Sequence, residues 1–210
     1  RSLGLLVDVT NYVLLEMGQP VHAFDAAKIR GNTIQIRRAK TGEKISGLDG
    51  GVHELTPQDL VIADAQGPVA LAGVVGGKES AVGSATQKIL LESARFHSGT
   101  VRKTARRLPL HTESSRRFGR GGLDPALVER ARNRVISLLQ QCGALEKVEG
   151  MITVGAETPK EGAGISLRLA KVEQMLGQAL DPKKIQARLT ALGFESRGDG
   201  WIAPSWREDV

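Results

Sequence analysis

The stretch VDVTNYVLLEMGQPVHAFD, from Val7 to Asp25, decides how this chain begins to fold. Leu6, just before it, and three apolar residues within it recur with helical spacing: Val9, Val13 and Met17. Because Gly18 can close a helix and Pro20 cannot continue one, the pattern predicts a helix followed by a turn. Three hydrogen-bonding residues are left without a role in the core: Thr10, Asn11 and His22. We expect these three to meet in a candidate site.

The composition is typical of a globular protein that meets a polyanion. Of the 210 residues, 40% are hydrophobic, which is enough to build a buried core in one large domain or two modest ones. The formal charge of +6 and the isoelectric point near 9.7 favour an acidic partner, with nucleic acid as the first candidate. Patterned sequence reaches both ends, from Leu3 to Val210, so we interpret the chain as a part of a longer protein.

The single cysteine and the absence of long apolar runs indicate a cytoplasmic location. Cys142 has no partner for an internal disulfide, and its place near the end of a helical pattern predicts an ordinary buried thiol. No apolar run approaches the roughly 20 residues that a membrane-spanning helix needs. We therefore expect a reducing compartment and no membrane partner.

The middle of the chain is predicted to be rich in strands, with helices before and after it. Thr33 to Arg38 alternates as a strand does, and Gly50 with Gly51 indicates a hairpin turn. Three short apolar runs predict buried strands: 61–63, 69–72 and 89–91. Later helices are predicted from Ser98 as a cap through Leu108, and from Asp124 and Pro125 to a stop at Gly143.

The composition changes between Gly155 and Gly164, where glycine, proline, glutamate and lysine predominate. Such a stretch is typical of a linker, so we predict one domain over 1–155, a linker over 156–164 and a second domain over 165–210. The second domain reads as a strand (165–169), a helix to Leu176, a helix capped by Asp181, and a hairpin turning at 198–200. The expected fold class is mixed α/β (α+β), with a winged-helix-like second domain.

Three separated motifs together resemble one known family. They are the stretch from Val7 to Asp25, LAGVVGGKES from Leu71, and ILLESARF from Ile89. In this order and spacing they resemble the editing domain of the bacterial phenylalanyl-tRNA synthetase β subunit, over nearly all 210 residues. The resemblance implies hydrolysis of tyrosine wrongly attached to the phenylalanine tRNA. The positions that match the family's site are Thr10, Asn11, His22, Ala72, Gly76 and Glu92.

The resemblance implies that Glu92 and the backbone N–H of Gly76 contact the phenol hydroxyl of tyrosine, while Ala72 keeps one wall shallow. An editing pocket of this kind should offer a hydrogen bond that phenylalanine cannot use. When buried beside the phenol, Glu92 is expected to be ionised and satisfied by donors, because an unpaired buried carboxylate is costly. Without the resemblance, the glycines would suggest only a turn, and Glu92 a solvated carboxylate at a strand end.

His22 is the candidate base, because imidazole titrates near neutral pH. With Asn11 and Thr10 it would orient the ester, its ribose or the attacking water. No serine or cysteine nucleophile is visible beside a histidine and a carboxylate, which favours direct attack by water. The alternative is a structural histidine, and HAFD alone is no metal motif.

A basic stretch from Arg102 to Arg120 contains seven Lys or Arg residues and one acid, Glu113. The candidates for contact with nucleic acid are Arg102, Lys103, Arg106, Arg107, Arg116 and Arg117, although an ordinary solvated helix face fits equally well. The segment LHTESSRRFGRGGLDP departs from the family pattern, with Gly119 in place of an acid and one extra residue.

The terminal PSWREDV resembles the motif in which an aspartate helps to bind Mg²⁺ in the whole enzyme; the matching residue is Asp209. One carboxylate alone should not hold Mg²⁺. By resemblance, editing needs no cofactor, whereas the full heterotetramer uses ATP and Mg²⁺ and pairs this subunit with an α subunit. The alternatives are a module that only binds RNA or braces the subunits, and a domain that binds a free amino acid.

Overall fold

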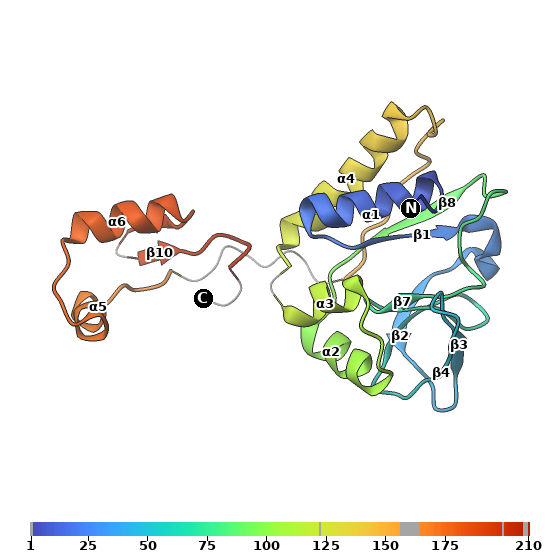
Figure 1. Cartoon of the computed structure of the whole chain (residues 1–210), viewed down its shortest axis with the longest axis horizontal. Coiled ribbons are helices and arrows are strands. Elements are labelled where there is room, and N and C mark those ends of the chain that lie inside the picture. The colour runs from blue at the N-terminus through green and yellow to red at the C-terminus, as the bar shows by residue number, and fades with distance from the viewer. Residues whose placement is uncertain (1, 122, 156–163, 199, 208–209) are drawn as a thin grey trace. The chain divides into compact units, whose positions relative to one another are not determined.

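Helix α1 (Leu5–Met17) forms where the sequence predicts it (Figure 1). Val9 and Val13 are its buried residues. Gly18 ends the helix in the left-handed conformation, with φ at 79°, and its N–H donates to the carbonyl of Leu14 at 2.9 Å. A residue without a Cβ adopts this backbone conformation at no steric cost. The chain then turns through Pro20 directly into the first strand.

The computed structural model describes residues 2–121, 123–155, 164–198, 200–207 and 210, which form two compact units, 1–150 and 151–210. The first unit continues with β1 (Val21–Asp25), the 3₁₀ turns η1 (Ala26–Lys28) and η2 (Arg30–Asn32), β2 (Gln35–Arg38), β3 (Lys44–Ser46), β4 (Val52–Glu54), β5 (Leu60–Ala63), β6 (Pro68–Leu71), β7 (Val75–Gly76), β8 (Ile89–Ser93), α2 (Ser98–Arg107), α3 (Glu113–Arg120) and α4 (Pro125–Gln141). Helices and antiparallel strands together confirm the predicted α+β class.

Strands β1 and β8 form an antiparallel ribbon that is covered on both faces. In its register His22 lies opposite Glu92 and Ala23 lies opposite Leu91. Val21, Ile89 and Leu91 pack into a cluster with the buried residues of α1 and α4. Phe24 points the other way, into a cluster with Ile62 and Ala70. Because side chains alternate along a strand, His22 shares the face of Phe24.

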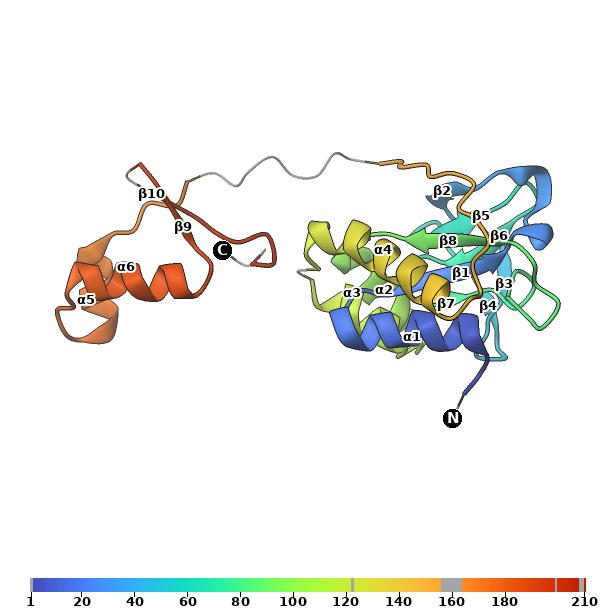
Figure 2. The same cartoon turned by 90° about the horizontal axis from the view of Figure 1, so that it is seen from above.

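The second sheet has the strand order β2-β5-β6-β7, all antiparallel. Val61 and Leu71 belong to a core cluster with the buried side chains of α2 and α3, whereas Ile62 and Ala70 belong to the cluster around Phe24. Figure 1 shows α1 and α4 on one side of the strands and α2 and α3 on the other, and α1 lies beside α4 in Figure 2. The ribbon and the sheet therefore face each other between two helical layers.

The second unit contains α5 (Leu169–Leu176), α6 (Pro182–Ala191) and the hairpin of β9 (Glu195–Arg197) with β10 (Gly200–Ile202). Asp181 caps α6, because its carboxylate accepts from the N–H of Lys183 at 2.9 Å. The strand predicted over 165–169 is reduced to one bridge between Ile165 and Trp201, since α5 begins at Leu169. The linker predicted over 156–164 lies outside the described residues except for Gly164 and stays a prediction.

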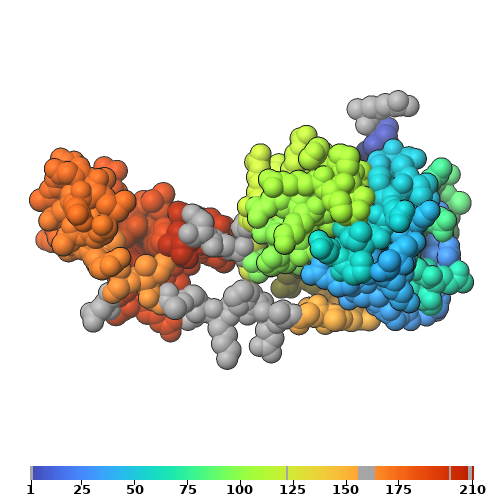
Figure 3. Space-filling view, turned by 90° about the horizontal axis from the view of Figure 1, so that it is seen from below, coloured from blue at the N-terminus to red at the C-terminus, as the bar shows by residue number. Residues whose placement is uncertain are grey.

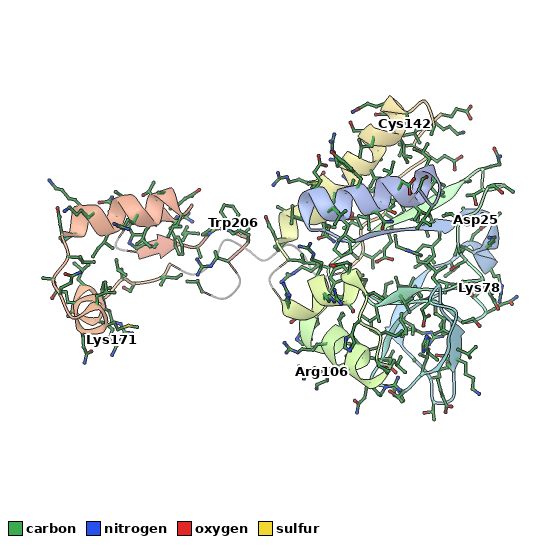
Figure 4. The ribbon with its side chains drawn as sticks, in the orientation of Figure 1. Asp25, Lys78, Arg106, Cys142, Lys171 and Trp206 are labelled. Atoms are coloured by element: carbon green, nitrogen blue, oxygen red, sulfur yellow. The ribbon has the colours of Figure 1, made fainter. Side chains whose placement is uncertain are left out.

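Two expectations about the helices were wrong, and one helix was missed. His97 caps α2 in place of Ser98, with Nδ1 accepting from the N–H of Thr100 at 3.3 Å. Helix α3 was not predicted as a separate element. Cys142 is exposed and not buried, because it follows the last turn of α4 as its C-terminal cap, beyond the buried stripe (Figure 4). No helix within the described residues is long and apolar enough to cross a membrane.

A buried carboxylate, Asp59, fastens α2 to the start of β5. It accepts hydrogen bonds from the N–H of Thr56 at 2.8 Å and from the hydroxyl of Thr104 at 2.8 Å, and it pairs with Arg107. Burial alone would raise the pKa of Asp59, but these hydrogen bonds and the guanidinium hold it below its ordinary value. The carboxylate is therefore ionised and fully satisfied.

We expect Asp59→Ala to lower the free energy of unfolding by about 2 to 4 kcal/mol, because it leaves the hydroxyl of Thr104 and the partly buried Arg107 without their acceptor. Urea denaturation followed by circular dichroism measures this loss. Arg107→Ala is the matched control and should cost less, since the threonine donors to Asp59 remain. An equal or larger loss in Arg107→Ala would contradict this account of Asp59.

Candidate functional site

A pocket of about 250 Å³ lies in the first unit between α1, the ribbon, the second sheet and the start of α3. This volume lies just below the roughly 300 to 1,000 Å³ of most small-molecule sites. It therefore suits one amino-acid side chain better than a large ligand. The lining residues are Thr10, Asn11, Leu14, Pro20, Val21, His22, Ile62, Ala70, Leu71, Gly73, Val74, Val75, Gly76, Glu92, Thr112, Glu113, Ser114 and Phe118.

The structure brings five of the six expected site residues to this pocket: Thr10, Asn11, His22, Gly76 and Glu92. They come from α1, β1, β7 and β8, which are separated by long stretches of chain. Ala72 does not line the pocket. It is only 2% exposed and packs in the cluster around Phe24, while Ala70 and Leu71 supply this part of the wall.

His22 is a partly buried, neutral imidazole. Its Nε2 is buried and has no hydrogen-bond partner among the described residues. The ring meets the Phe24 ring edge-on, with the centroids 4.4 Å apart. Burial lowers the pKa of His22 to about 4, because the charged form is poorly solvated there. At pH 7 the imidazole is uncharged, and it is a weaker base than a solvated histidine.

Glu92 lies directly across the ribbon from His22, on the same face. Burial raises the pKa of Glu92 to about 7. Within the described part of the chain, no donor hydrogen-bonds its carboxylate, and burial is the cause of the raised pKa. The expectation that Glu92 is ionised and satisfied by donors when it lies beside a phenol stays a prediction. Glu92 therefore faces the pocket with an unused hydrogen-bonding capacity.

Gly76 touches the ring of His22. A Cβ placed on Gly76 would lie 2.4 Å from Cε1 and 2.8 Å from Nε2 of His22, and 3.0 Å from Cδ1 of Leu48. Contacts under 3 Å do not occur between real atoms of these kinds, so any other residue at position 76 must displace the imidazole or the strand. The absence of a side chain is thus required by the position of His22.

Thr10 and Asn11 lie on the pocket side of α1. The hydroxyl of Thr10 donates to the carbonyl of Val7 at 2.9 Å, which leaves its oxygen available only as an acceptor. Asn11 is exposed, and its amide has no partner among the described residues. Thr10 can therefore accept a hydrogen bond from a ligand, and Asn11 can both donate and accept.

The start of α3 supplies a wall that the sequence did not predict. The hydroxyl of Thr112 donates to the carbonyl of Val74 at 2.7 Å and accepts from the N–H of Ser115 at 3.0 Å. The hydroxyl of Ser114 donates to the carbonyl of Gly73 at 3.1 Å. Thr112 followed by Glu113 is an N-cap signature, and this signal would have revealed the helix.

The predicted nucleic-acid residues lie on α2 and α3, which form much of the face shown in Figure 3 in green. Most have partners within the chain. Arg107 pairs with buried Asp59, and Glu113 lies 3.6 Å from Arg116 and 3.8 Å from Arg117. Arg102 donates to the carbonyl of Gly119 at 3.5 Å.

The remaining two, Lys103 and Arg106, are exposed without a partner in the described residues, and Arg106 extends outward in Figure 4. Gly119 lies inside α3, where an added Cβ would meet Arg102 at an ordinary 3.6 Å. Contact with nucleic acid through this face stays a prediction, centred on Lys103 and Arg106.

The predicted metal residue, Asp209, lies outside the described residues. Among those that are described, no group of three His, Cys, Asp or Glu side chains is arranged to hold a metal ion. A second hollow of about 230 Å³ is lined by Lys28, Arg30 and Lys44. Arg30 is already bonded there to Glu79 at 2.7 Å and to Gln66 at 2.8 Å.

Comparisons with known proteins identify similar sequences. Residues 1–144 match the sequence profile described as the B3/4 domain. A phenylalanine-tRNA ligase beta subunit from Yersinia pestis is 42% identical over 215 residues, and one from Vibrio vulnificus (strain YJ016) is 43% identical over 215; each alignment covers 100% of this chain and 27% of the relative. One from Geobacter sulfurreducens is 44% identical over 194 residues, or 92% of this chain and 24% of the relative. The chain spans about a quarter of the length of these relatives.

Gly76→Ala should disturb the pocket because the new methyl group meets the His22 ring. We expect a loss of about 1 to 3 kcal/mol in the free energy of unfolding, typical of an overpacked site. The matched control is Gly67→Ala, where a Cβ meets nothing within 4 Å. His22→Ala should recover part of the loss in the double mutant. Strictly additive losses would contradict the contact.

Glu92→Gln should stabilise the domain in a pH-dependent manner. A folded-state pKa near 7, above the ordinary 4.5, means that stability is fully present below pH 4.5 and is lost as pH rises through 7. The variant should match the wild type at pH 4.5 and exceed it by about 2 to 3 kcal/mol above pH 8. Chemical denaturation across pH 4.5 to 8.5 measures the difference, and a difference independent of pH would contradict the raised pKa.

Proposed function

The chain belongs to the B3/4 domain family and corresponds to a part of phenylalanine-tRNA ligase beta subunits, and from this we propose that its pocket hydrolyses tyrosine wrongly esterified to the phenylalanine tRNA. The observation that carries the proposal is the carboxylate of Glu92. It lines a pocket of amino-acid size and is partly buried there without a partner among the described residues.

The phenol hydroxyl gives Glu92 the partner that it lacks. A tyrosine side chain can donate to the ionised carboxylate or accept from the protonated acid, and both forms are populated when the pKa is near 7. Phenylalanine can do neither, so its entry leaves a desolvated carboxyl group without a hydrogen bond. Sites that are built to bond a hydroxyl discriminate strongly against analogues that lack it. The pocket would thus select tyrosine because phenylalanine leaves the carboxyl group of Glu92 without a hydrogen bond.

The surrounding groups favour direct hydrolysis by water. Ser114 lines the pocket, but its hydroxyl donates to the carbonyl of Gly73 and makes no hydrogen bond to a basic side chain among the described residues, so an acyl-enzyme has no support. His22, Thr10 and Asn11 offer one unpartnered ring nitrogen, one acceptor and one amide. Because the pKa of His22 is about 4, the imidazole would position the water or ester by hydrogen bonding, and the rate should be level between about pH 5 and 7.

In the longer relatives this editing would accompany attachment of phenylalanine to tRNA. We propose that the whole protein pairs with an α subunit that carries the adenylate site, uses ATP and Mg²⁺ for that attachment, and works in the cytoplasm. The editing pocket itself needs no cofactor in this proposal. Arg107 serves Asp59 in the fold, so contact with tRNA phosphates would fall first on Lys103 and Arg106.

A second candidate function is an RNA-binding or subunit-bracing module that does not hydrolyse esters. The exposed Lys103 and Arg106 are the observation that favours it. That function would give His22 and Glu92 no role. Yet His22 lowers the stability of the fold at acid pH, and Glu92 lowers it near neutral pH. Hydrolysis accounts for both sets of residues.

Deacylation of tyrosyl-tRNA by the folded chain tests the proposal. Glu92→Ala should slow the reaction by about 10- to 100-fold, since it removes a charge-assisted hydrogen bond worth about 1.5 to 3 kcal/mol. His22→Gln should slow it while the domain stays folded. Glu146→Ala and His111→Gln are the controls, because both residues are exposed and outside the pocket. Tyrosyl-tRNA left intact by the wild type, or unchanged rates in Glu92→Ala, would overturn the assignment.

A further inference from the structure

We propose that Glu113 binds the α-ammonium group of the amino acid that occupies this pocket. This inference rests on the proposed function, because it assumes that the ligand is an aminoacyl ester. It adds a second recognition element at the opposite end of the amino acid from the side chain. Its consequence is that an ester whose amine is blocked should be refused.

The lining of the pocket carries only acidic fixed charges. Two carboxylates line it, Glu92 from β8 and Glu113 from α3, and none of the lining residues that the structure describes is Lys or Arg. His22 adds no charge at pH 7, because its pKa is about 4. A pocket with this balance attracts a cation and disfavours a free carboxylate. An aminoacyl ester fits such a pocket, because it carries an ammonium group and its carboxyl group is esterified.

The charge on Glu113 is available to a ligand. Its carboxylate lies 3.6 Å from Arg116 and 3.8 Å from Arg117, but it accepts no hydrogen bond from the described residues. All three side chains are about half exposed, and such surface pairs contribute little energy. An ammonium donor at hydrogen-bonding distance would therefore improve the contacts of Glu113 without breaking a strong pair.

The backbone around Glu113 is held in place. Thr112 and Ser114, the residues on either side, donate to the carbonyls of Val74 and Gly73. Glu113 is also the first residue of α3, where the helix dipole favours an ionised carboxylate. The helix end alone would explain an acid at this position. The acidic pocket beside it, with the unpartnered Nε2 of His22, indicates a ligand as well.

The α-amino group of an aminoacyl ester is the one positive charge next to the bond that breaks. Terminal amines titrate near pH 7.7 to 8.0, so most of this group is protonated at neutral pH. An ammonium held by Glu113 and a phenol held by Glu92 would fix the amino acid at two points. The ester carbon, one bond from the ammonium-bearing carbon, would then lie among the polar groups of α1 and β1. Glu113 is thus a positioning residue.

Binding of two small probes to the chain tests the charge requirement. The probes are L-tyrosinamide and 3-(4-hydroxyphenyl)propionamide, which differ only by the amine. The wild type should bind tyrosinamide about 10-fold more tightly, as expected for one charge-assisted contact, and Glu113→Gln should abolish this preference. Glu129→Gln is the matched control: Glu129 is an exposed helical glutamate, 3.1 Å from Arg132 at i+3, outside the pocket. It should keep the preference.

Deacylation supplies a second measurement. Wild-type chain should hydrolyse tyrosyl-tRNA faster than N-acetyl-tyrosyl-tRNA, and Glu113→Gln should slow only the first. If no ester is cleaved but the amine-dependent preference in binding is present and lost in Glu113→Gln, the proposed hydrolysis fails and the role of Glu113 stands. If the wild type binds both probes equally, if Glu113→Gln keeps the preference, or if it slows both esters alike, the inference about Glu113 is overturned.

Discussion

The antiparallel pairing of β1 with β8 is the constraint on which the rest of the first unit depends. One face of this ribbon packs against α1 and α4 and the other against the second sheet, so its apolar residues other than the exposed Leu90 are divided between two interiors. The register sets His22 opposite Glu92 on the sheet-facing side. The alternation of side chains between the two faces of the ribbon therefore determines both which residues enter the core and which residues line the pocket.

Two carboxylates in this unit, the buried Asp59 and the partly buried Glu92, show how surroundings separate a structural role from a chemical one. Asp59 receives hydrogen bonds from two threonines and a guanidinium, so its pKa falls and its charge helps to hold α2. Glu92 receives none from the described residues, and its pKa rises to about 7. Side chains with this pattern of desolvation without compensation cluster at functional sites. The carboxylate of Glu92 can therefore still accept hydrogen bonds from a ligand, whereas that of Asp59 already accepts them from the fold.

Much of the fold could be predicted because the relevant signals are local. Helix α1 has an apolar stripe and a glycine stop, and the short apolar runs became strands β5, β6 and β8. Helix α3 escaped prediction because its sequence, ESSRRFGR, carries a single large apolar residue, Phe118, and is held by contacts to a loop about 40 residues earlier. The exposure of Cys142 likewise depends on where α4 ends relative to α1, against which it packs.

The sequence predicted which residues line the pocket better than it predicted their contacts and hydrogen-bond partners. Five expected residues meet in the pocket, but the sequence could not indicate that Ala72 faces a core cluster while Ser114 reaches the pocket. Nor could it show that the partner of Arg107 is Asp59, which removes this arginine from the free surface. The hydrogen-bond partners of a buried carboxylate escape prediction for the same reason: donors are supplied by packing between distant segments, which one sequence does not display.

The hydrogen bonds of Thr112 and Ser114 to the loop at 73–74 also bear on how quickly the pocket can be used. They attach one wall to the same segment that leads into β7, so this side of the pocket is assembled before any ligand arrives. Preformed sites capture ligands without waiting for a slow rearrangement, and most differences between related ligands then appear in how fast they leave. A ligand that satisfies Glu92 would be retained, and one that does not would dissociate before reacting; selection would thus be a matter of residence time.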